Sequence, residues 1–489
     1  MNSLDLIVFV AYLAGVTGLG AYFYRRAGTV RGFTQAGGHL PGWVVGLSIF
    51  GTYVSSISFL ALPGKAYGGD WNVFAFSLSL PAAAWMASRW FAPLYRAEGD
   101  VSAYAFLERR FGAWARLYAM TCYLLTQFAR VGTILFLVAL ATERLAGWDI
   151  VTIIIVTGAL VTLYTTLGGI EAVIWTDAVQ SAVLAAGAVI CALWLLFGMP
   201  QGPGQLFDIA GAADKFSLGS MAVSFTAETV WVTLLYGLFI NVQNFGIDQN
   251  YVQRYHATPT LHEARKSIWV GALLYLPISA LFLFIGSGLY AFYSARPELL
   301  PEALRLSGMD DRVFPHFIVT QLPQGVVGVV IAAISAAAMS TISSSLNSSA
   351  TVLMSDVYAR FLRPDADDRA RTRFLRVMTV LLGIGGTGAA LAMISIKSAL
   401  DVWWRLAGVA SGGMLGLFLL AAFARRVGPR PAAVGVAAGV AVIVWATFSQ
   451  AWGLPALNPL HPLMTVVIGT LAVLGVGVAI KHRGTTNKN

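Results

Sequence analysis

The residues best suited to chemistry lie in a serine-rich stretch of an otherwise apolar segment. Eight of the ten positions from 340 to 349 are polar. Ser340, Thr341 and Ser344 share one face of a helix, because residues three and four apart lie on the same side. Hydroxyl and carbonyl oxygens are hard, nearly neutral ligands that suit a monovalent cation. The stretch therefore predicts a monovalent-cation site, or alternatively hydroxyls that bond back to their own helix.

Two ionisable side chains also fall within apolar segments. Asp177 lies a few residues inside the end of one segment, and an unpaired carboxylate at mid-membrane costs about 2.5 to 3.5 kcal/mol. A bound cation would offset this cost, and hydration at the interface is the alternative. Glu171, in the adjoining loop, is expected to be solvated. Arg130 lies about 20 Å into its helix. Its guanidinium suits the carboxylate of an anionic solute or a structural ion pair with Asp70 or Asp177.

Other kinds of chemistry find little support. Cys122 and Cys191 both lie in apolar segments, so neither a disulfide framework nor a cysteine metal site is expected. The histidines are scattered, and none is spaced as a ligand pair. No phosphate-binding loop, nucleophile elbow or paired His/Glu motif stands in a plausible context. A membrane enzyme is therefore disfavoured, because the apolar segments hold no acid–base pair.

The elements that position these residues are membrane-spanning helices. Hydrophobic residues make up 57% of the chain and charged ones 11%, which is more apolar surface than a soluble fold needs. Apolar stretches of about 20 residues, long enough to cross a bilayer, recur thirteen times. Their approximate ranges are 4–25, 41–66, 72–96, 117–142, 149–168, 171–198, 222–246, 267–294, 324–359, 374–396, 399–424, 428–451 and 463–480.

The positions of the cations predict the orientation of these spans. Of the 32 Lys and Arg residues, 23, including Arg254, fall in alternate loops that we place inside, and eight fall in the loops between them. The remaining cation is Arg130. Because cations are retained on the cytoplasmic side, the N-terminus is expected outside and the C-terminus in the cytoplasm. Topology therefore accounts for the net charge of +9, and no nucleic-acid partner is needed.

Two segments five helices apart interrupt the apolar pattern in a similar way. The first reads Gly-Thr-Tyr-Val-Ser-Ser-Ile-Ser over 51–58, and the second reads Asn-Val-Gln-Asn-Phe-Gly-Ile-Asp over 241–248. Such groups are costly in lipid unless the helix breaks and lines a cavity, as at the sites of inverted-repeat transporters. The pair predicts a five-plus-five core. The alternative is that small residues merely let helices pack closely.

Several longer motifs run through nearly the whole chain. They are Leu-Pro-Gly-Trp at 40–43, Ser-Ser-Ile-Ser-Phe at 55–59, Pro-Gly-Lys-Ala at 63–66, Gly-Gly-Ile-Glu at 168–171, Val-Ile-Trp-Thr-Asp at 173–177, Val-Gln-Arg-Tyr at 252–255 and Ile-Ser-Ser-Ser-Leu-Asn-Ser at 342–348. With these motifs the chain resembles the sodium/solute symporter family, and in particular its bacterial sodium-sialic acid symporters.

The resemblance implies an all-α polytopic membrane protein with a LeuT-like five-plus-five inverted repeat. One extra helix would precede the repeat and two would follow it, which agrees with about 13 transmembrane helices. A single transporter domain, 1–489, would contain the extra helix (4–25), the first repeat (41–198), the second repeat (222–424) and the two C-terminal helices (428–480). The protein would be multi-pass in a bacterial inner membrane, in contact with the lipid bilayer.

The resemblance also implies the binding residues. One sodium site would use the backbone carbonyls of Gly51, Val54 and Ala337 with the hydroxyls of Ser340 and Thr341. A second sodium site, present in the sialic acid members, would use Asp177, Ser340, Ser343 and Ser344. The solute would lie between the broken helices, beside Tyr53, Ser55, Ser58, Ser77 and Gln243, and Arg130 would pair with its carboxylate.

Four positions depart from the sialic acid members. Tyr53 stands where those members have a Thr, and Ser77 stands where they have a Gln. Thr341 replaces a Ser but keeps the hydroxyl, and Gly51 replaces an Ala that acts through its carbonyl. The expected cargo is a small organic anion such as sialic acid or a related sugar acid. A smaller monocarboxylate, an amino acid or a neutral sugar is the alternative.

The implied activity is secondary symport by alternating access, with one or two Na⁺ as coupling ions. Sodium would join the first broken helix to the ninth segment, complete the solute pocket and allow the core to rock. A rival from another class is a non-transporting solute sensor or a channel on the same fold, although no appended cytoplasmic domain supports sensing.

Overall fold

Long apolar helices build the protein, as the sequence predicts. The computed structural model describes residues 2–306, 308–394, 412–451 and 458–484, and the regular elements in these ranges are all helices. Within them, eight helices are long and apolar enough to cross a membrane, and one bent pair makes a ninth span. The eight are α1 (Ser3–Tyr22), α9 (Ala113–Ala146), α10 (Ile150–Phe197), α12 (Val230–Ile247), α14 (Leu261–Ala295), α16 (Val326–Leu353), α17 (Asp368–Met393) and α19 (Pro429–Ala451).

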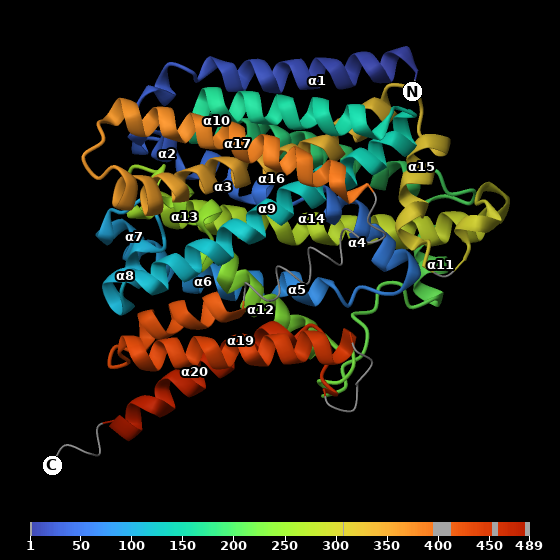
Figure 1. The fold of residues 1–489 in the computed structure, drawn as a ribbon. Helices are drawn as coiled ribbons and strands as arrows, with labels where there is room; N and C mark the ends of the chain where they lie inside the picture. The colour runs from blue at the N-terminus through green and yellow to red at the C-terminus, as the bar shows by residue number, and fades with distance from the viewer. Residues whose placement is uncertain (1, 307, 395–411, 452–457, 485–489) are drawn as a thin grey trace.

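Shorter helices complete the described chain. They are α2 (Val30–Gln35), α5 (Phe74–Leu78), α6 (Leu80–Met86), α7 (Ala92–Glu98), α8 (Ala105–Phe111), α11 (Pro203–Ala212), α13 (Gln249–His256), α15 (Val313–Gln321) and the helix Gly412–Phe423, with single turns such as η1 (Arg26–Gly28) and η6 (Asp310–Arg312) between them. The last helix, α20 (Met464–Gly484), has 21 residues, and its apolar part ends at Ile480. Figure 1 shows the long helices lying side by side, with α1 at one edge of the bundle and α19 and α20 at the opposite edge.

Most expected spans coincide with one helix, and the differences have physical reasons. The spans 149–168 and 171–198 are joined in α10, whose 48 residues would be about 72 Å long if straight, far more than a bilayer needs. Gly169 divides it, with a φ of 57° that glycine adopts readily. The span 72–96 is a series of short helices, α5, α6 and α7. The first half of the span 399–424 lies outside the described residues, and the second half contains the apolar helix Gly412–Phe423.

Both interruptions seen in the sequence are breaks in the backbone. The bent pair is α3 (Gly42–Tyr53) and α4 (Ser56–Gly68), whose axes differ by 58°. Val54 and Ser55 between them are extended, with ψ of 117° and 170°. Helices α12 and α13 are separated by Asp248, which is also extended and whose carboxylate accepts from the Asn250 amide. Side-chain capping of this kind supplies partners for backbone groups that a break leaves unpaired.

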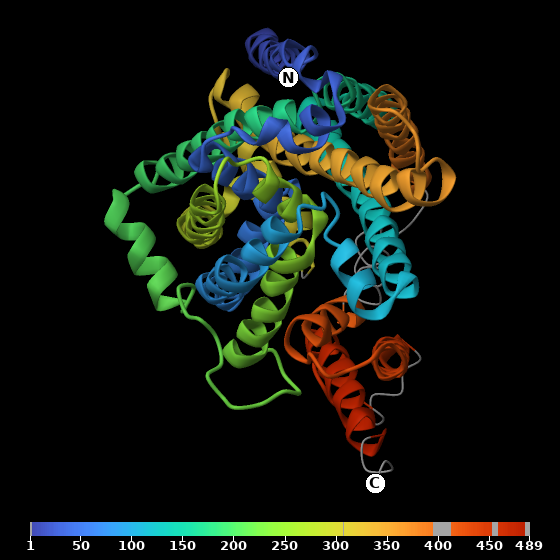
Figure 2. The same cartoon turned by 90° about the vertical axis from the view of Figure 1, so that its left-hand side faces the viewer.

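The serine-rich helix α16 occupies the interior. It packs on α10, α9, α17, α1 and α3, and every residue from Val330 to Val352 is buried. Figure 2 looks along the helices and shows α1 at the periphery and the α19–α20 pair on the far side of the bundle. Because α16 is enclosed on all sides, its hydroxyls face protein rather than lipid.

Glycine at position 286 allows α4, the second half of the broken helix, to approach α14 closely. A Cβ on Gly286 of α14 would lie 2.2 Å from the Pro63 carbonyl oxygen of α4 and 2.8 Å from Ala66 Cβ. Both neighbours are held in a helix, so an added methyl group can be accommodated only if the two helices separate.

Gly286→Ala should therefore lower the thermal midpoint of the purified protein, because overpacking costs about 1 to 3 kcal/mol. Gly388→Ala on α17 is the matched control, since nothing lies within 4 Å of its added Cβ. Replacing that glycine should be neutral or stabilising by up to about 1 kcal/mol. Equal midpoints for the two variants in a thermal melt would contradict the close packing of α14 on α4.

Candidate functional site

The break in α3 lies directly against the serine-rich part of α16. Ser340 Oγ donates to the Gly51 carbonyl at 2.7 Å, and it lies 3.2 Å from the Ala337 carbonyl. Thr341 Oγ1 donates to the same Ala337 carbonyl at 3.1 Å. Val54, the remaining expected ligand of the first sodium site, is buried where α3 ends. Four of the five expected ligands thus form one cluster of oxygens between α3 and α16.

Bonding of the hydroxyls to their own helix, the alternative considered above, is also present. Ser343 and Ser344 both donate to the Ser340 carbonyl, at 3.1 and 2.7 Å. The two interpretations are compatible, because a hydroxyl that donates its proton to a carbonyl keeps its lone pairs for a cation.

Asp177 is paired with an arginine that the sequence analysis had assigned to a cytoplasmic loop. Asp177 Oδ2 accepts from Arg254 Nη2 at 2.7 Å and from Ser48 Oγ at 2.6 Å, and the Asp and Arg side chains are 0% and 1% exposed. Arg254 also donates to Ser344 Oγ at 2.6 Å. The loop assignment of Arg254 was therefore wrong. The Val-Gln-Arg-Tyr motif on α13 was the one signal in the sequence that marked this residue.

The second oxygen of the Asp177 carboxylate is left free. Asp177 Oδ1 is buried without a hydrogen-bond partner, whereas Thr52 Oγ1 lies 3.4 Å from Oδ2 and 2.9 Å from Ser344 Oγ. Buried acceptors are almost always satisfied, so an orphaned carboxylate oxygen is a place where a cation fits. Among the described residues no group of three or more His, Cys, Asp or Glu is arranged to hold a metal ion.

Arg130 reaches the break in α3 from the long helix α9. Its Nη2 donates to the Thr52 carbonyl at 3.3 Å, directly before the break. The two ion pairs considered as alternatives are not formed, since Asp177 pairs with Arg254 and Asp70 accepts from the Asn72 amide at 2.9 Å. No carboxylate of the described chain forms a salt bridge with Arg130.

Tyr53 connects the two broken helices. Its hydroxyl donates to Asn241 Oδ1 on α12. Its ring packs against Phe245, Tyr251 and Tyr275, at centroid distances of 5.8, 6.4 and 4.6 Å. Tyr53 is an expected solute residue, whereas the aromatic side chains around it could not be expected from local sequence, because they come from three different helices.

The other expected solute residues lie around the same crossing of helices. Gln243 on α12 is 8% exposed, and its Oε1 has no hydrogen-bond partner. Ser55 is buried at the break, and Ser58 lies one turn farther along on α4. Ser77 is buried on α5, which packs against α12.

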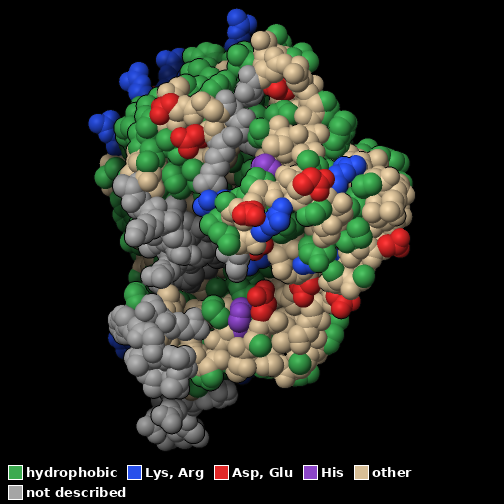
Figure 3. Space-filling model, turned by 90° about the vertical axis from the view of Figure 1, so that its right-hand side faces the viewer, with side chains coloured by type: hydrophobic (Ala, Val, Ile, Leu, Met, Phe, Trp, Pro, Cys, Tyr) green, Lys and Arg blue, Asp and Glu red, His purple; other side chains and the backbone are tan. Residues whose placement is uncertain are grey.

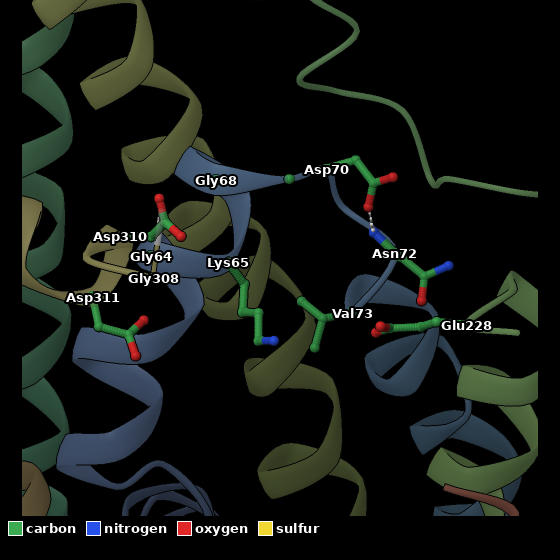
Figure 4. A pocket seen from close by; sticks show the side chains of 11 residues that line it. Gly64, Lys65, Gly68, Asp70, Asn72, Val73, Glu228, Gly308, Asp310 and Asp311 are labelled. Atoms are coloured by element: carbon green, nitrogen blue, oxygen red, sulfur yellow. Dashed lines mark hydrogen bonds between the residues drawn. The ribbon is translucent and has the colours of Figure 1, made fainter. Parts of the chain in front are cut away.

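A polar cavity lies farther along, where α4 ends. Its volume is about 390 Å³, and its lining includes Lys65, Asp70, Glu228, Asp310 and Asp311. Figure 4 shows Lys65 extending between the two aspartates of η6 and the side of Asp70 and Glu228. Burial raises the pKa of the Asp311 carboxyl and neighbouring Asp310 adds to the effect, while Lys65 opposes it. Figure 3 views this end of the molecule, where acidic and basic side chains are intermixed.

At the other end of the bundle, the expectation that Glu171 is solvated was wrong. Glu171 is 2% exposed and accepts from Arg26 Nη1 at 2.8 Å, with His39 Nε2 at 3.4 Å. The adjoining break in α10 at Gly169 turns this carboxylate toward the chain that follows α1.

Comparison with known proteins places these features in a family. The family model described as the sodium:solute symporter family matches residues 33–439. The sodium/sialic acid symporter NanT of Aliivibrio fischeri is 34% identical, over 96% of this chain and 93% of its own length. The sodium/sialic acid symporter SiaT of Proteus mirabilis is 33% identical, over 96% and 94%.

Solved structures confirm the predicted fold class. A substrate-bound, outward-open Na⁺-coupled sialic acid symporter superimposes with a TM-score of 0.91, at 32% identity over 98% of both chains. The transporter Mhp1 in a closed conformation has the same fold, with a TM-score of 0.60 at 18% identity, over 92% of this chain and 94% of its own. The chain therefore belongs to the sodium:solute symporter family and is a multi-pass membrane transporter, not an enzyme, that couples sodium to the movement of a small solute.

Proposed function

We propose that this transporter imports a carboxylated sugar acid of the sialic acid type together with two sodium ions. The observation that carries the proposal is the position of Arg130, a permanently charged group that reaches the carbonyl beside the α3 break and has no salt-bridge partner in the described chain. A carboxylate between the broken helices would supply that partner in bidentate geometry. The names of the two bacterial relatives support the same solute.

The first sodium ion would bind the carbonyls of Gly51, Val54 and Ala337 and the hydroxyls of Ser340 and Thr341. A cation there would attract oxygens from both α3 and α16, so the bent helix would be held against its neighbour only while sodium is bound. Solute residues on the bent helix, such as Tyr53 and Ser55, would thereby be positioned. This is the proposed physical basis of coupling.

The second sodium ion would bind Asp177 with Ser340, Ser343 and Ser344. The unpartnered Asp177 Oδ1 supports this site, because Arg254, Ser48 and Thr52 all approach the other oxygen. Two sodium ions and one monoanion would carry one net positive charge inward. That charge contributes about 2.3 kcal/mol per 100 mV of membrane potential, whereas a single sodium ion would make the cycle electroneutral.

The proposed orientation has the N-terminus outside and the C-terminus in the cytoplasm of a bacterial inner membrane. The bias of cations toward alternate loops supports it. The beginning of α1 and the end of α20 lie at opposite ends of the bundle, as an odd number of crossings requires (Figure 1). The cavity at the end of α4 would then open to the outside and form the entrance for sodium.

A smaller monocarboxylate is the second candidate, and Tyr53 favours it. The side chain fills space between the broken helices, and its hydroxyl is engaged by Asn241. A Tyr in place of a Thr reduces the volume left for a solute.

A sensor or a channel on the same fold is the alternative from another class. Such a protein would bind the solute without stoichiometric flux of sodium and solute in proteoliposomes.

Ser340→Ala should raise the sodium concentration for half-maximal uptake by about tenfold or more, because one charge-assisted interaction is worth roughly 1.5 to 3 kcal/mol. The measurement is solute uptake into proteoliposomes across a series of sodium concentrations. Ser349→Ala, a change at a buried serine farther along α16, is the control and should behave as the parent protein. Unchanged sodium dependence in Ser340→Ala would remove this residue from the first site.

Ser343→Ala should lower the number of sodium ions transported per solute from two to one, and Asp177→Asn should do the same. The readout is the charge moved per solute, which falls from about one to zero when the second site is lost. Asp177→Asn also leaves Arg254 buried without its carboxylate, which costs stability, so the serine variant provides the milder test. A charge ratio that stays at one in both variants would contradict the second site.

Arg130→Gln should abolish stabilisation of the protein by an acidic solute while leaving sodium binding intact. The measurement is a thermal shift in Na⁺ against K⁺ with sialic acid, smaller monocarboxylates, amino acids and neutral sugars. Sialic acid should raise the melting temperature of the parent protein only in Na⁺. Stabilisation by a neutral sugar alone, or by an acid equally well in Arg130→Gln, would refute the proposed role of Arg130 in binding the carboxylate.

A further inference from the structure

A second cavity lies between η1, the turn that follows α1, and the first turns of α17. These two elements are distant in the sequence. The cavity has a volume of about 280 Å³ and is lined by Gly28, Arg369, Thr372, Arg373, Arg376 and Val377. A Cβ on Gly28 would meet nothing within 4 Å, so the cavity is open on that side. Three guanidinium groups thus line a small groove that contains no sodium-site or solute-site residue.

The arginines of this groove form no salt bridge within the described protein. No ion pair in the described chain includes Arg369, Arg373 or Arg376. Arg376 donates to the Ala27 carbonyl at 3.3 Å and lies 4.9 Å from the centre of the Tyr24 ring, and its Nε is buried without a hydrogen-bond partner. The Arg376 guanidinium is therefore held in place, and its Nε–H remains available to donate to an anion.

The acidic side chains near the groove already have hydrogen-bond partners. Asp367 caps α17 by accepting from the Ala370 amide at 2.8 Å. Asp368 accepts from the Val30 amide at 3.3 Å. Glu171 is paired with Arg26. Each of these three carboxylates already accepts a hydrogen bond from another group, and none of them forms a salt bridge with the arginines of the groove.

The face of α17 that carries the arginines continues as an exposed apolar surface. Residues three, four and seven apart share a helix face, so the arginine row leads to Val377, Val380, Leu381 and Ile384. These side chains are 46%, 38%, 53% and 64% exposed. Tyr24, beside Arg376, is 48% exposed, and aromatic residues of this kind collect at the level of lipid headgroups.

We propose that this groove binds the headgroup of an anionic phospholipid, with the acyl chains along the apolar surface of α17. The order of groups on α17, cations first and aliphatic side chains next, matches the order of phosphate and hydrocarbon in a lipid. Basic pockets between transmembrane helices on the cytoplasmic side bind such headgroups. A free phosphate ion would use the guanidinium groups but not the apolar surface.

The bound phosphate would link two elements that are distant in the sequence. Arg376 of α17 already contacts Ala27 in η1, and a phosphate between Arg369, Arg373 and Arg376 would hold the segment after α1 against α17 more firmly. Anionic lipid is therefore expected to stabilise the transporter as well as to bind it.

The test is native mass spectrometry of the delipidated protein titrated with phosphatidylglycerol or phosphatidylcholine, with a thermal melt of each sample. Phosphatidylglycerol should bind about tenfold more tightly than phosphatidylcholine and raise the melting temperature. In Arg369→Gln/Arg373→Gln this preference should fall to less than about threefold. Both arginines are exposed, so the change should leave folding intact.

Two controls make the result decisive. Arg430→Gln removes an exposed cation at the start of α19 and should leave the lipid preference unchanged. Arg369→Lys/Arg373→Lys keeps the charge and should retain most of it.

Three outcomes would overturn the proposal. They are equal binding of the two lipids, a loss in Arg430→Gln as large as in the groove variant, and inorganic phosphate that stabilises the protein as much as phosphatidylglycerol.

Discussion

A helix that is broken inside an apolar bundle must find partners for the backbone groups freed at the break. The break after α3 lies at Val54 and Ser55. Helix α16 places a row of hydroxyls beside it, and the Ser340 hydroxyl donates to the Gly51 carbonyl. These oxygens satisfy one another only in part, because each hydroxyl donates one proton and keeps lone pairs free. We propose that a monovalent cation completes this cluster. Under this proposal, the geometry of α3, and with it the solute site, would depend on the cation bound between α3 and α16.

The second broken helix is connected to the first through a buried charge. Arg254 on α13 contacts Ser48 of α3, Asp177 of α10 and Ser344 of α16, so one guanidinium joins four elements. A buried ion pair costs desolvation and contributes little net stability. Its value lies in specifying one arrangement of the helices, with the remaining Asp177 oxygen open to a cation. Arg130 adds a third intramembrane charge, placed where α3 breaks.

Much of this could be predicted from local sequence. The serine-rich run, the two interruptions and the isolated Asp177 and Arg130 stand out because polar groups are rare in apolar segments. Arg254 did not stand out. When the orientation of the spans is predicted from cations in the loops, every arginine near the end of a helix is taken to be solvated. The partner of Arg254 is 77 residues away, and no local pattern reports such a pairing. The aromatic side chains around Tyr53 escaped notice for the same reason, as did the pairing of Glu171 with Arg26, 145 residues away.

The central claim is that sodium holds the broken helix α3 against α16, and hydrogen–deuterium exchange in nanodiscs tests it most directly. Peptides covering residues 51–58 and 337–345 should exchange more slowly in Na⁺ than in K⁺ at equal ionic strength. The difference should disappear in Ser340→Ala, while peptides of α19 should be unaffected. Exchange at the break that is the same in both salts, or sodium protection that survives in Ser340→Ala, would contradict the account.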